Sequence, residues 1–374
     1  MALSELDHLR LREALALAEQ AFARSEPNPR VGCVIGHADG RVLARGATLE
    51  PGRAHAEAAA LAACREAGLD PRGATAWVTL EPCAHHGRTP PCADALVAAG
   101  LARVVVGASD PFPQVDGRGM ERLRAAGVVV ELAHGDLAQA CREINIGFFS
   151  RVQRGRPWVR MKAAASLDGR TALPDGTSQW ITAAAARADG HAWRRRASAV
   201  LTGIGTVLED DPRLDVRLVP ATHQPLRVIV DSRLQTPPSA RVLPPPGQVL
   251  VVAAQEQPAS AQALRERGAE VLCIPGPGGK VDLAALLAEL ARRGVNELHV
   301  EAGHKLNGSL LHAGLVDELL LYQAPMLLGE GRGIAALGVL PALPEAAPWH
   351  FHEVQQVGVD LRLRLRRGPA PTIS

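Results

Sequence analysis

The chain has 374 residues, about twice the size of a usual domain, which favours two domains that each have a core. Hydrophobic residues make up 47% and charged residues 21%, so a largely disordered chain is excluded. With 41 Lys and Arg against 39 Asp and Glu, the net charge of +2 gives no overall field that would attract nucleic acid or an anionic membrane.

The N-terminal stretch MALSELDHLRLREALALAEQAFARS carries charges every few residues, so it predicts an amphipathic helix and not a signal peptide. No segment has the length and apolar character of a membrane span. Six cysteines without a secretion signal predict reduced thiols in the cytoplasm. Four of them have apolar neighbours and are expected to be small buried residues, namely Cys33, Cys64, Cys141 and Cys273.

After the first helix, the sequence alternates between strand and helix patterns. Residues 31–36 and 41–48 predict a hairpin, because they flank a turn that ends in glycine. Further strands are expected at 74–80, 103–110 and 128–133, and helices at 55–68, 92–100 and 119–127. This order predicts a three-layer α/β domain whose sheet is covered on both faces.

The stretch SRVQRGRPW interrupts this rhythm and has the composition of a linker, so we place a domain boundary near Phe149, giving domains 1–149 and 150–374. The second domain is also predicted to be α/β. Its Pro-rich insert at 234–247 is expected to lie on the surface without regular structure, and the tail after Leu365 is expected to fray. Strands are expected at 157–166, 225–231, 247–254, 269–275, 296–303 and 317–325, and a helix at 281–294.

A zinc-binding pattern lies in the first domain. His55-Ala56-Glu57 opens a helix, and Cys83 and Cys92 each stand near a predicted helix start, where the helix dipole favours a thiolate. One imidazole and two thiolates on Zn²⁺ leave a fourth position for a water that the metal acidifies. Glu57 is then the carboxylate that moves protons between that water and a leaving ammonia. The pattern predicts a hydrolytic deaminase.

Eight residues, AHHGRTPP, separate the two cysteines, whereas deaminases usually have P-C-x-x-C. The spacing leaves His85 or His86 open as the third ligand in place of Cys92, and it leaves open a structural zinc site. His85, His86, Arg88 and Thr89 can donate hydrogen bonds to a phosphate at the rim, or they form a solvated loop. Asn28, between two prolines, is either a rigid amide that binds a ring edge or a turn residue.

These residues, taken together, resemble the bifunctional riboflavin-biosynthesis deaminase/reductase family. The matching motifs are PNPRVGCVI, HAEAAAL, VTLEPCAHHGRTPPC, SDPFPQVDGRG, KAAASLDGRTA, SQWIT, GTVLEDDPRL, VIVDS and HVEAG, which extend over nearly the whole chain. The long cysteine spacing is typical of that family. The resemblance implies a cytidine-deaminase-like N-terminal domain and a dihydrofolate-reductase-like C-terminal domain. The absence of G-x-G-x-x-G after any strand agrees with this, because it disfavours a Rossmann site.

The resemblance implies deamination of 2,5-diamino-6-(5-phosphoribosylamino)pyrimidin-4-one and then reduction of its ribosyl group to ribityl by NADPH. In the first domain it implies Asn28 and Arg88 as substrate contacts, with Zn²⁺ on His55, Cys83 and Cys92. Seven residues before His55 the family normally has a substrate-holding histidine, whereas this chain has Thr48.

In the second domain the resemblance assigns a cofactor set and a substrate set. We expect Lys162 and Glu301 to polarise or protonate the imine, while Arg194 and Arg217 suit a sugar phosphate. The turn that starts a helix at residues 303–309 offers free main-chain N–H groups to a cofactor phosphate. The substrate set is Ser178, Arg194, Leu214, Arg217 and Glu301, and the NADPH set is Ala164, Trp180, Thr206, Asp210, Ser232, Gly303, His304, Lys305, Leu306, Asn307, Gly308 and Ser309.

Two other interpretations remain at this point. A nucleic-acid or nucleoside deaminase fused to an unrelated binding domain shares the zinc chemistry, but 3% aromatic residues and a near-zero net charge disfavour a polyanion partner. A non-catalytic zinc scaffold is disfavoured by Glu57 beside a three-ligand site. Purely structural roles also remain open: Trp180 as a core residue, Arg194 as a solvated arginine and Asp210 as a helix or turn cap. The family implies a homo-oligomer that acts on a phosphorylated pyrimidine, with neither a nucleic acid nor a membrane as partner.

Overall fold

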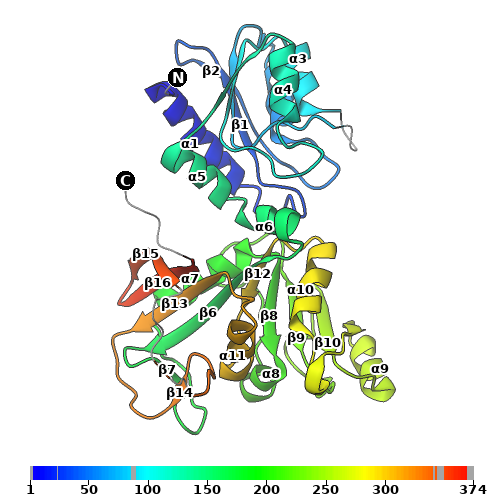
Figure 1. Ribbon diagram of the computed structural model, residues 1–374, viewed down its shortest axis with the longest axis vertical. Coiled ribbons are helices and arrows are strands. Elements are labelled where there is room, and N and C mark those ends of the chain that lie inside the picture. Colours follow the sequence, from blue (N-terminus) through cyan, green and yellow to red (C-terminus); the bar gives the residue numbers. More distant parts are fainter. Residues whose placement is uncertain (1–2, 23, 86–89, 340–341, 343–348, 369–374) are drawn as a thin grey trace. The chain divides into compact units, whose positions relative to one another are not determined.

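The computed structural model describes residues 3–22, 24–85, 90–339, 342 and 349–368. The chain divides into two compact units, Met1–Gly155 and Arg156–Ser374, and each unit has its own sheet (Figure 1). The expected boundary near Phe149 falls inside helix α6 (Ile146–Arg154), and the division follows that helix, at Gly155. None of the described helices combines the length and the apolar character that crossing a bilayer requires.

The first unit has a five-stranded sheet in the order β2-β1-β3-β4-β5. The hairpin predicted near the N-terminus forms, because β1 and β2 pair antiparallel; β1 also pairs antiparallel with β3, and β3, β4 and β5 are parallel. The strands are β1 (Gly32–Gly36), β2 (Val42–Ala47), β3 (Thr75–Val78), β4 (Arg103–Val106) and β5 (Val129–Leu132).

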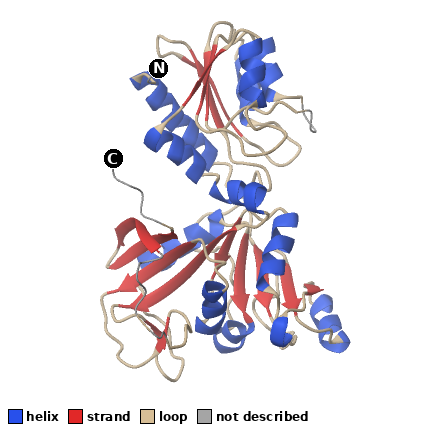
Figure 2. Ribbon diagram, in the orientation of Figure 1, coloured by secondary structure: helices blue, strands red, loops and turns tan. Residues whose placement is uncertain are grey.

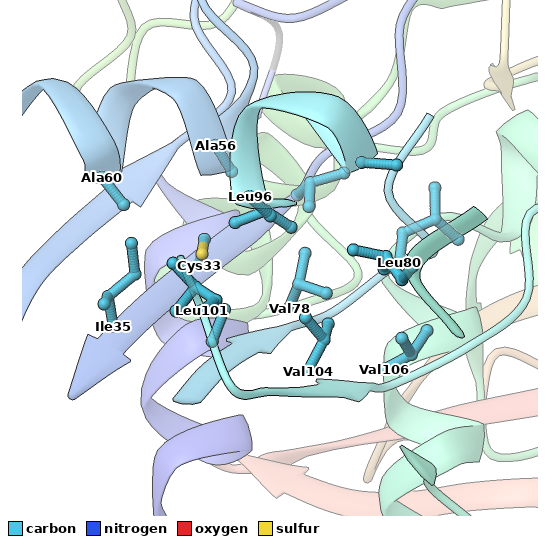
Figure 3. Packing of buried hydrophobic residues seen from close by; sticks show 14 of the residues in the cluster. Cys33, Ile35, Ala56, Ala60, Val78, Leu80, Leu96, Leu101, Val104 and Val106 are labelled. Carbon is cyan, nitrogen blue, oxygen red and sulfur yellow. The ribbon is translucent and has the colours of Figure 1, made fainter. Parts of the chain in front are cut away.

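Helices cover both faces of this sheet, as the sequence predicts (Figure 2). Alternate strand residues form two cores: Val34, Trp77 and Val105 pack with the α1 side, while Val78 and Val104 face Leu96 on the other side (Figure 3). Period-two alternation in each strand therefore supplies both cores. The helices are α1 (Glu5–Glu19) and α5 (Gly135–Glu143) on the first side, and α2 (Ala56–Glu66), α3 (Cys92–Ala98) and α4 (Arg118–Ala125) on the second.

A buried carboxylate fastens α1 to the sheet. Asp7 is 2% exposed; its carboxylate accepts hydrogen bonds from the Trp77 indole at 2.7 Å and from two nitrogens of Arg103 at 2.7 and 2.9 Å. The same carboxylate completes a capping box with Ser4, which begins the helix. Although burial opposes ionisation, these hydrogen bonds hold the pKa of Asp7 below its usual range.

The second unit has a nine-stranded sheet in the order β11-β10-β9-β8-β12-β6-β13-β16-β15. The seven strands from β11 to β13 are parallel, and β16 and β15 add an antiparallel edge. A small separate pair joins β7 and β14. The strands are β6 (Trp158–Ser166), β7 (Arg170–Ala172), β8 (Ala199–Gly203), β9 (Leu226–Val230), β10 (Val249–Ala253), β11 (Glu270–Cys273), β12 (Glu297–Val300), β13 (Glu318–Ala324), β14 (Arg332–Gly333), β15 (Trp349–Val357) and β16 (Asp360–Arg367).

One face of this sheet is apolar and the other, near its centre, is charged. Val159 and Met161 of β6 enter the apolar core, whereas Arg160 between them is fully buried and pairs with Glu297 at 2.9 Å and Glu318 at 2.5 Å. Each charge there needs a counter-charge, because an unpaired buried ion is costly. The helices of the unit are α7 (Ala184–Arg196), α8 (Ile204–Asp210), α9 (Pro258–Glu266), α10 (Leu283–Arg292) and α11 (His304–His312).

Three expectations for the second unit differ from the structure in whole or in part. The Pro-rich insert has no helix or strand, as predicted, and many of its residues are exposed, but Val242 and Leu243 are buried in a core cluster. Strand β16 continues to Arg367, so the chain is still regular directly after Leu365, and residues 369–374 of the predicted tail lie outside the described residues. Cys273 is exposed, since it lies at the end of edge strand β11. The other three cysteines expected to be buried are buried.

Asp7→Asn should destabilise the first unit by about 3 kcal/mol, because Arg103 loses the charge of a buried partner. Native-state hydrogen exchange of the β1 and β3 amides, read by mass spectrometry, reports this loss within the unit. Glu5→Gln is the matched control, since Glu5 is an exposed acid in the same helical turn. Equal exchange in the Asp7 and Glu5 variants would contradict the anchoring role.

Candidate active sites

The first turn of α2 carries two of the predicted deaminase residues. His55 is the N-cap residue of the helix and Glu57 lies in its first turn, as the H-A-E pattern predicts. The helix start packs directly on β2, since a Cβ atom at Gly46 would lie 2.2 Å from the carbonyl oxygen of Ala56. Only glycine allows this approach, which fixes where the imidazole and the carboxylate emerge.

The segment before Cys83 is held by a buried carboxylate. Glu81 is 4% exposed, and its two oxygens accept main-chain N–H groups from Asp110, Gly117, Gly119 and Met120 at 3.0–3.3 Å. Gly119 is needed in this contact, because a Cβ atom there would lie 1.9 Å from the Pro82 oxygen. The loop that carries Cys83 is therefore fixed in place by the two residues that precede this metal ligand.

Cys92 begins α3 as predicted, but Cys83 lies in a loop and not at a helix start. The helix dipole still acts on both thiols, because the main-chain N–H of Cys92 donates to Sγ of Cys83 at 3.3 Å. The N–H of Ala93 donates to the carbonyl oxygen of Cys83 at 3.1 Å. These two bonds join the cysteines directly, across the eight intervening residues.

The three predicted ligands converge. Nδ1 of His55 lies 3.6 Å from Sγ of Cys83 and 3.5 Å from Sγ of Cys92, and the three ligand atoms all lie within 4.8 Å of one another. One imidazole nitrogen and two sulfurs in this arrangement fit a tetrahedral Zn²⁺ site with one position left over. Among the described residues this is the one group of three or more such side chains that could hold a metal ion.

The electrostatics of this group suit a cation. Hydrogen bonding from Cys92 and His55 lowers the pKa of Cys83 despite its burial, which favours the thiolate form of Cys83. The hydrogen bond to that thiolate, with burial, raises the pKa of Cys92. Glu57 is 3% exposed, and burial together with the charge of Cys83 raises its pKa to about 7. A bound cation would offset these repulsions.

Of the remaining deaminase-side predictions, Asn28 lies in a turn before β1, where its N–H donates to Ser25 at 2.7 Å. Thr48 is buried, and its hydroxyl exchanges hydrogen bonds with the main chain of Val31, so it is occupied within the protein. His85 lies beside Phe112, with ring centroids 5.8 Å apart. The proposed phosphate contact Arg88, together with His86 and Thr89, lies outside the described residues.

The second unit brings Lys162, Arg194 and Glu301 together. Glu301 follows β12 directly, and Arg194 from α7 holds its carboxylate through two nitrogens, one of them at 2.9 Å. The register of β12 with β6 places Glu301 next to Lys162. Burial lowers the pKa of Lys162, and the charge of Arg194 adds to this while Glu301 opposes it. Glu301 has a pKa well below its usual value, because Arg194, His299 and Lys162 outweigh its burial.

Several of the predicted NADPH residues lie where neighbouring parallel strands end, which is where open α/β sheets bind ligands. Ala164 lies in β6, Ser232 follows β9, and Thr206 and Asp210 lie in α8 after β8. A Cβ atom at Gly303 would lie 3.5 Å from Oγ1 of Thr206, so the starts of α8 and α11 adjoin. Because Gly303 provides no side-chain cap, the main-chain N–H groups at the start of α11 remain open to an anion. The other predicted cofactor residues of this helix are His304, Lys305, Leu306, Asn307, Gly308 and Ser309.

Asn307 and Trp180, two of the predicted NADPH residues, lie in opposite environments. Asn307 is buried, its Nδ2 donates to the Ile334 oxygen at 3.0 Å, and its main-chain N–H donates to the Gly303 oxygen at 3.1 Å, so both groups are occupied within the protein. Trp180 is 64% exposed and lies 4.5 Å from the guanidinium of Arg187. Trp180 is therefore not a core residue. Ser178 lies in the same segment, between β7 and α7.

Sequence reasoning missed three residues that hold these sites. Glu81 holds the loop next to Cys83, and its place in L-E-P-C was the available signal. His191 is buried in α7 and its Nδ1 accepts the N–H of Arg217 at 3.2 Å. Asp215 is 3% exposed and pairs with Arg217 at 2.6 Å. An acid between two arginines in R-L-D-V-R was the sequence pattern that could have identified Asp215.

Comparison with protein families agrees with both halves. Residues 4–108 match the cytidine and deoxycytidylate deaminase zinc-binding region, and residues 157–363 match the RibD C-terminal domain. The second match alone covers more than half of the chain. The alternative of an unrelated C-terminal binding domain is therefore wrong, and so is the non-catalytic scaffold.

Relatives match over nearly the whole length. The chain is 43% identical to riboflavin biosynthesis protein RibD of Escherichia coli over 96% of this chain and 99% of that protein, and 38% identical to RibD of Aquifex aeolicus over 97% and 99%. Among solved structures, RibD of Acinetobacter baumannii matches with a TM-score of 0.85 and 39% identity over 98% of this chain and 100% of that one.

A diaminohydroxyphosphoribosylaminopyrimidine deaminase/5-amino-6-(5-phosphoribosylamino)uracil reductase from Thermotoga maritima matches with a TM-score of 0.86 and 32% identity, covering 97% of this chain and 99% of that one. The cytidine-deaminase-like fold of the first unit and the reductase fold of the second are thus confirmed. With its three-ligand metal group in one unit and its reductase domain in the other, the chain belongs to the RibD family of bifunctional deaminase/reductases of riboflavin biosynthesis.

Proposed function

We propose that the first unit hydrolyses the amino group of 2,5-diamino-6-(5-phosphoribosylamino)pyrimidin-4-one and that the second unit uses NADPH to reduce the ribosyl group of the product to ribityl. The observation that carries the proposal is the pairing of a three-ligand metal group with a buried carboxylate, Glu57, that is not needed as a ligand. The name of the Thermotoga relative supports the choice of substrate.

In the deaminase half, His55, Cys83 and Cys92 would hold Zn²⁺. Zinc, when bound, supplies a water acidified toward neutral pH. Glu57 accepts a proton from that water, and it then passes a proton to the departing amino group, so water enters at the ring carbon and ammonia leaves. The burial of Glu57 excludes bulk water from this transfer. Asn28 and Arg88 would orient the pyrimidine and its phosphate.

In the reductase half, the strand-end residues would hold NADPH, which supplies the hydride. The hydride goes to the first carbon of the open-chain ribosyl imine, and a proton must reach the imine nitrogen. Lys162 lies beside Glu301 in the sheet register, and burial lowers its pKa, which makes it a readier proton donor. Arg194 keeps Glu301 ionised and in place. We infer also that the enzyme forms homo-oligomers in the cytoplasm, where Cys83 and Cys92 stay reduced.

A single assay tests the two-site proposal. The native chain receives the diaminopyrimidinone ribosyl phosphate with NADPH, and both ammonia release and NADPH oxidation are followed. We expect both signals, and a zinc-stripped sample should oxidise NADPH only with pre-deaminated substrate. No ammonia release by the zinc-loaded native chain would refute the substrate assignment.

Glu57→Gln should reduce ammonia release by about 10²–10⁴-fold, because the amide cannot accept a proton from the attacking water. Zinc content and NADPH oxidation with pre-deaminated substrate should be unchanged, which is the internal control. Ammonia release within tenfold of native would rule out Glu57 as the proton carrier.

Cys92→Ser should lower bound zinc from one per chain to a small fraction, because the third ligand is lost, whereas His85→Asn should leave zinc content unchanged. Elemental analysis of the purified variants measures this directly. The reverse result, with zinc lost only from the His85 variant, would show that the histidine completes the site.

Lys162→Met should lower NADPH oxidation with pre-deaminated substrate by about 10²-fold or more, because no proton donor then faces the imine. Ammonia release should persist. Lys280→Met is the control, since Lys280 is an exposed lysine of the same unit. If both lysine variants reduce the substrate at the native rate, the proton comes from elsewhere.

A further inference from the structure

In a short segment between α8 and β9, two arginines form ion pairs with the same buried aspartate. Arg213 pairs with Asp215 at 2.8 Å and Arg217 pairs with the same carboxylate at 2.6 Å. Asp215 is only 3% exposed, whereas each arginine side chain is 44% exposed. The carboxylate is therefore an internal anchor, and the two guanidinium groups are held side by side with part of each surface open.

The main chain of this segment is fixed from α7. Arg194, which holds Glu301, also donates to the carbonyl oxygen of Asp215 at 3.0 Å, and His191 accepts the N–H of Arg217 at 3.2 Å. Burial and the charges of Arg194 and Arg217 lower the pKa of His191 to about 4, so the ring is neutral and can accept. One helix thus sets the distance between Glu301 and the arginine pair.

Positive charge exceeds negative charge here. Among the ion pairs of the described residues, Arg213 and Arg217 each have only Asp215 as partner, so one carboxylate serves two cations. Arg227 is a third cation close enough to interact with both Asp215 and Arg213, and its own guanidinium donates to two neutral carbonyl oxygens. Two exposed guanidinium groups with an unmatched charge fit a phosphate dianion.

We propose that Arg213 is a second phosphate-binding residue of the reductase half, paired with Arg217, and that Asp215 positions both guanidinium groups. The ligand class is a sugar phosphate whose carbon chain extends toward Glu301 and Lys162. This rests on the reductase function proposed above and adds a residue that discriminates phosphorylated from unphosphorylated substrate. Arg217 alone could bind a phosphate, but the second guanidinium gives the two-sided contact that a dianion prefers.

The kinetic test compares native protein with Arg213→Gln, using pre-deaminated substrate and NADPH. We expect the KM for that substrate to rise about tenfold, while kcat and the KM for NADPH stay within about twofold, because one charge-assisted contact is lost. Arg213→Lys should recover part of the effect. Arg293→Gln is the matched control, as Arg293 is an ion-paired arginine of the same unit on Glu270 and Glu289. An unchanged KM, or equal changes in all three constants, would overturn the proposal.

A second measurement needs no turnover. Ribose 5-phosphate should slow hydrogen exchange in residues 211–225 of the native chain and of Arg293→Gln, but not in Arg213→Gln, and ribose should have no effect on any of them. Absence of protection in the native chain also overturns the proposal. If protection is present while native protein fails to oxidise NADPH, the phosphate site stands and the proposed reductase substrate is wrong.

Discussion

The charged centre of the second sheet constrains everything around it. Arg160 lies in the middle of a nine-stranded sheet with no exposed surface, so its charge must be balanced from the neighbouring strands. Glu297 from β12 and Glu318 from β13 do this, and they in turn recruit Arg196 and Arg364. The same strand faces continue to Lys162 and Glu301 toward the carboxyl edge. The candidate reductase site lies where this series of buried charges reaches the carboxyl edge of the sheet.

The metal group of the first unit depends on a different principle, since its ligands come from segments that are each fixed independently. Close packing at Gly46 places His55, the Glu81 carboxylate anchors the chain before Cys83, and the start of α3 places Cys92. None of these contacts requires the metal. Zinc binding therefore completes an arrangement already held by packing and main-chain hydrogen bonds, which lowers the ordering cost of the site.

Residues with distinctive chemistry were predictable from the sequence. The H-A-E pattern and the two cysteines identified the metal group, because few side-chain combinations suit zinc. A glycine-ended turn between two strands, followed by alternating helices and apolar strands, identified the first sheet. Strands β15 (Trp349–Val357) and β16 are not among the predicted strands, although leucine alternates with arginine in β16. The predicted surface position of the Pro-rich insert is only partly correct, because prolines exclude regular structure but do not prevent burial of Val242. Supporting residues such as Glu81 and Asp215 act through contacts distant in sequence, which periodicity does not reveal.

The link between Cys83 and Cys92 explains why their spacing can depart from the usual two residues. The N–H groups of Cys92 and Ala93 bond to Sγ and to the carbonyl oxygen of Cys83, so the two ends of the intervening chain are closed on each other at the metal group. The positions of the two sulfur ligands then do not depend on how many residues separate the cysteines. A deaminase built this way has a natural insertion point beside its reactive centre, where evolution or a protein engineer can change loop length and composition while the metal ligands keep their positions.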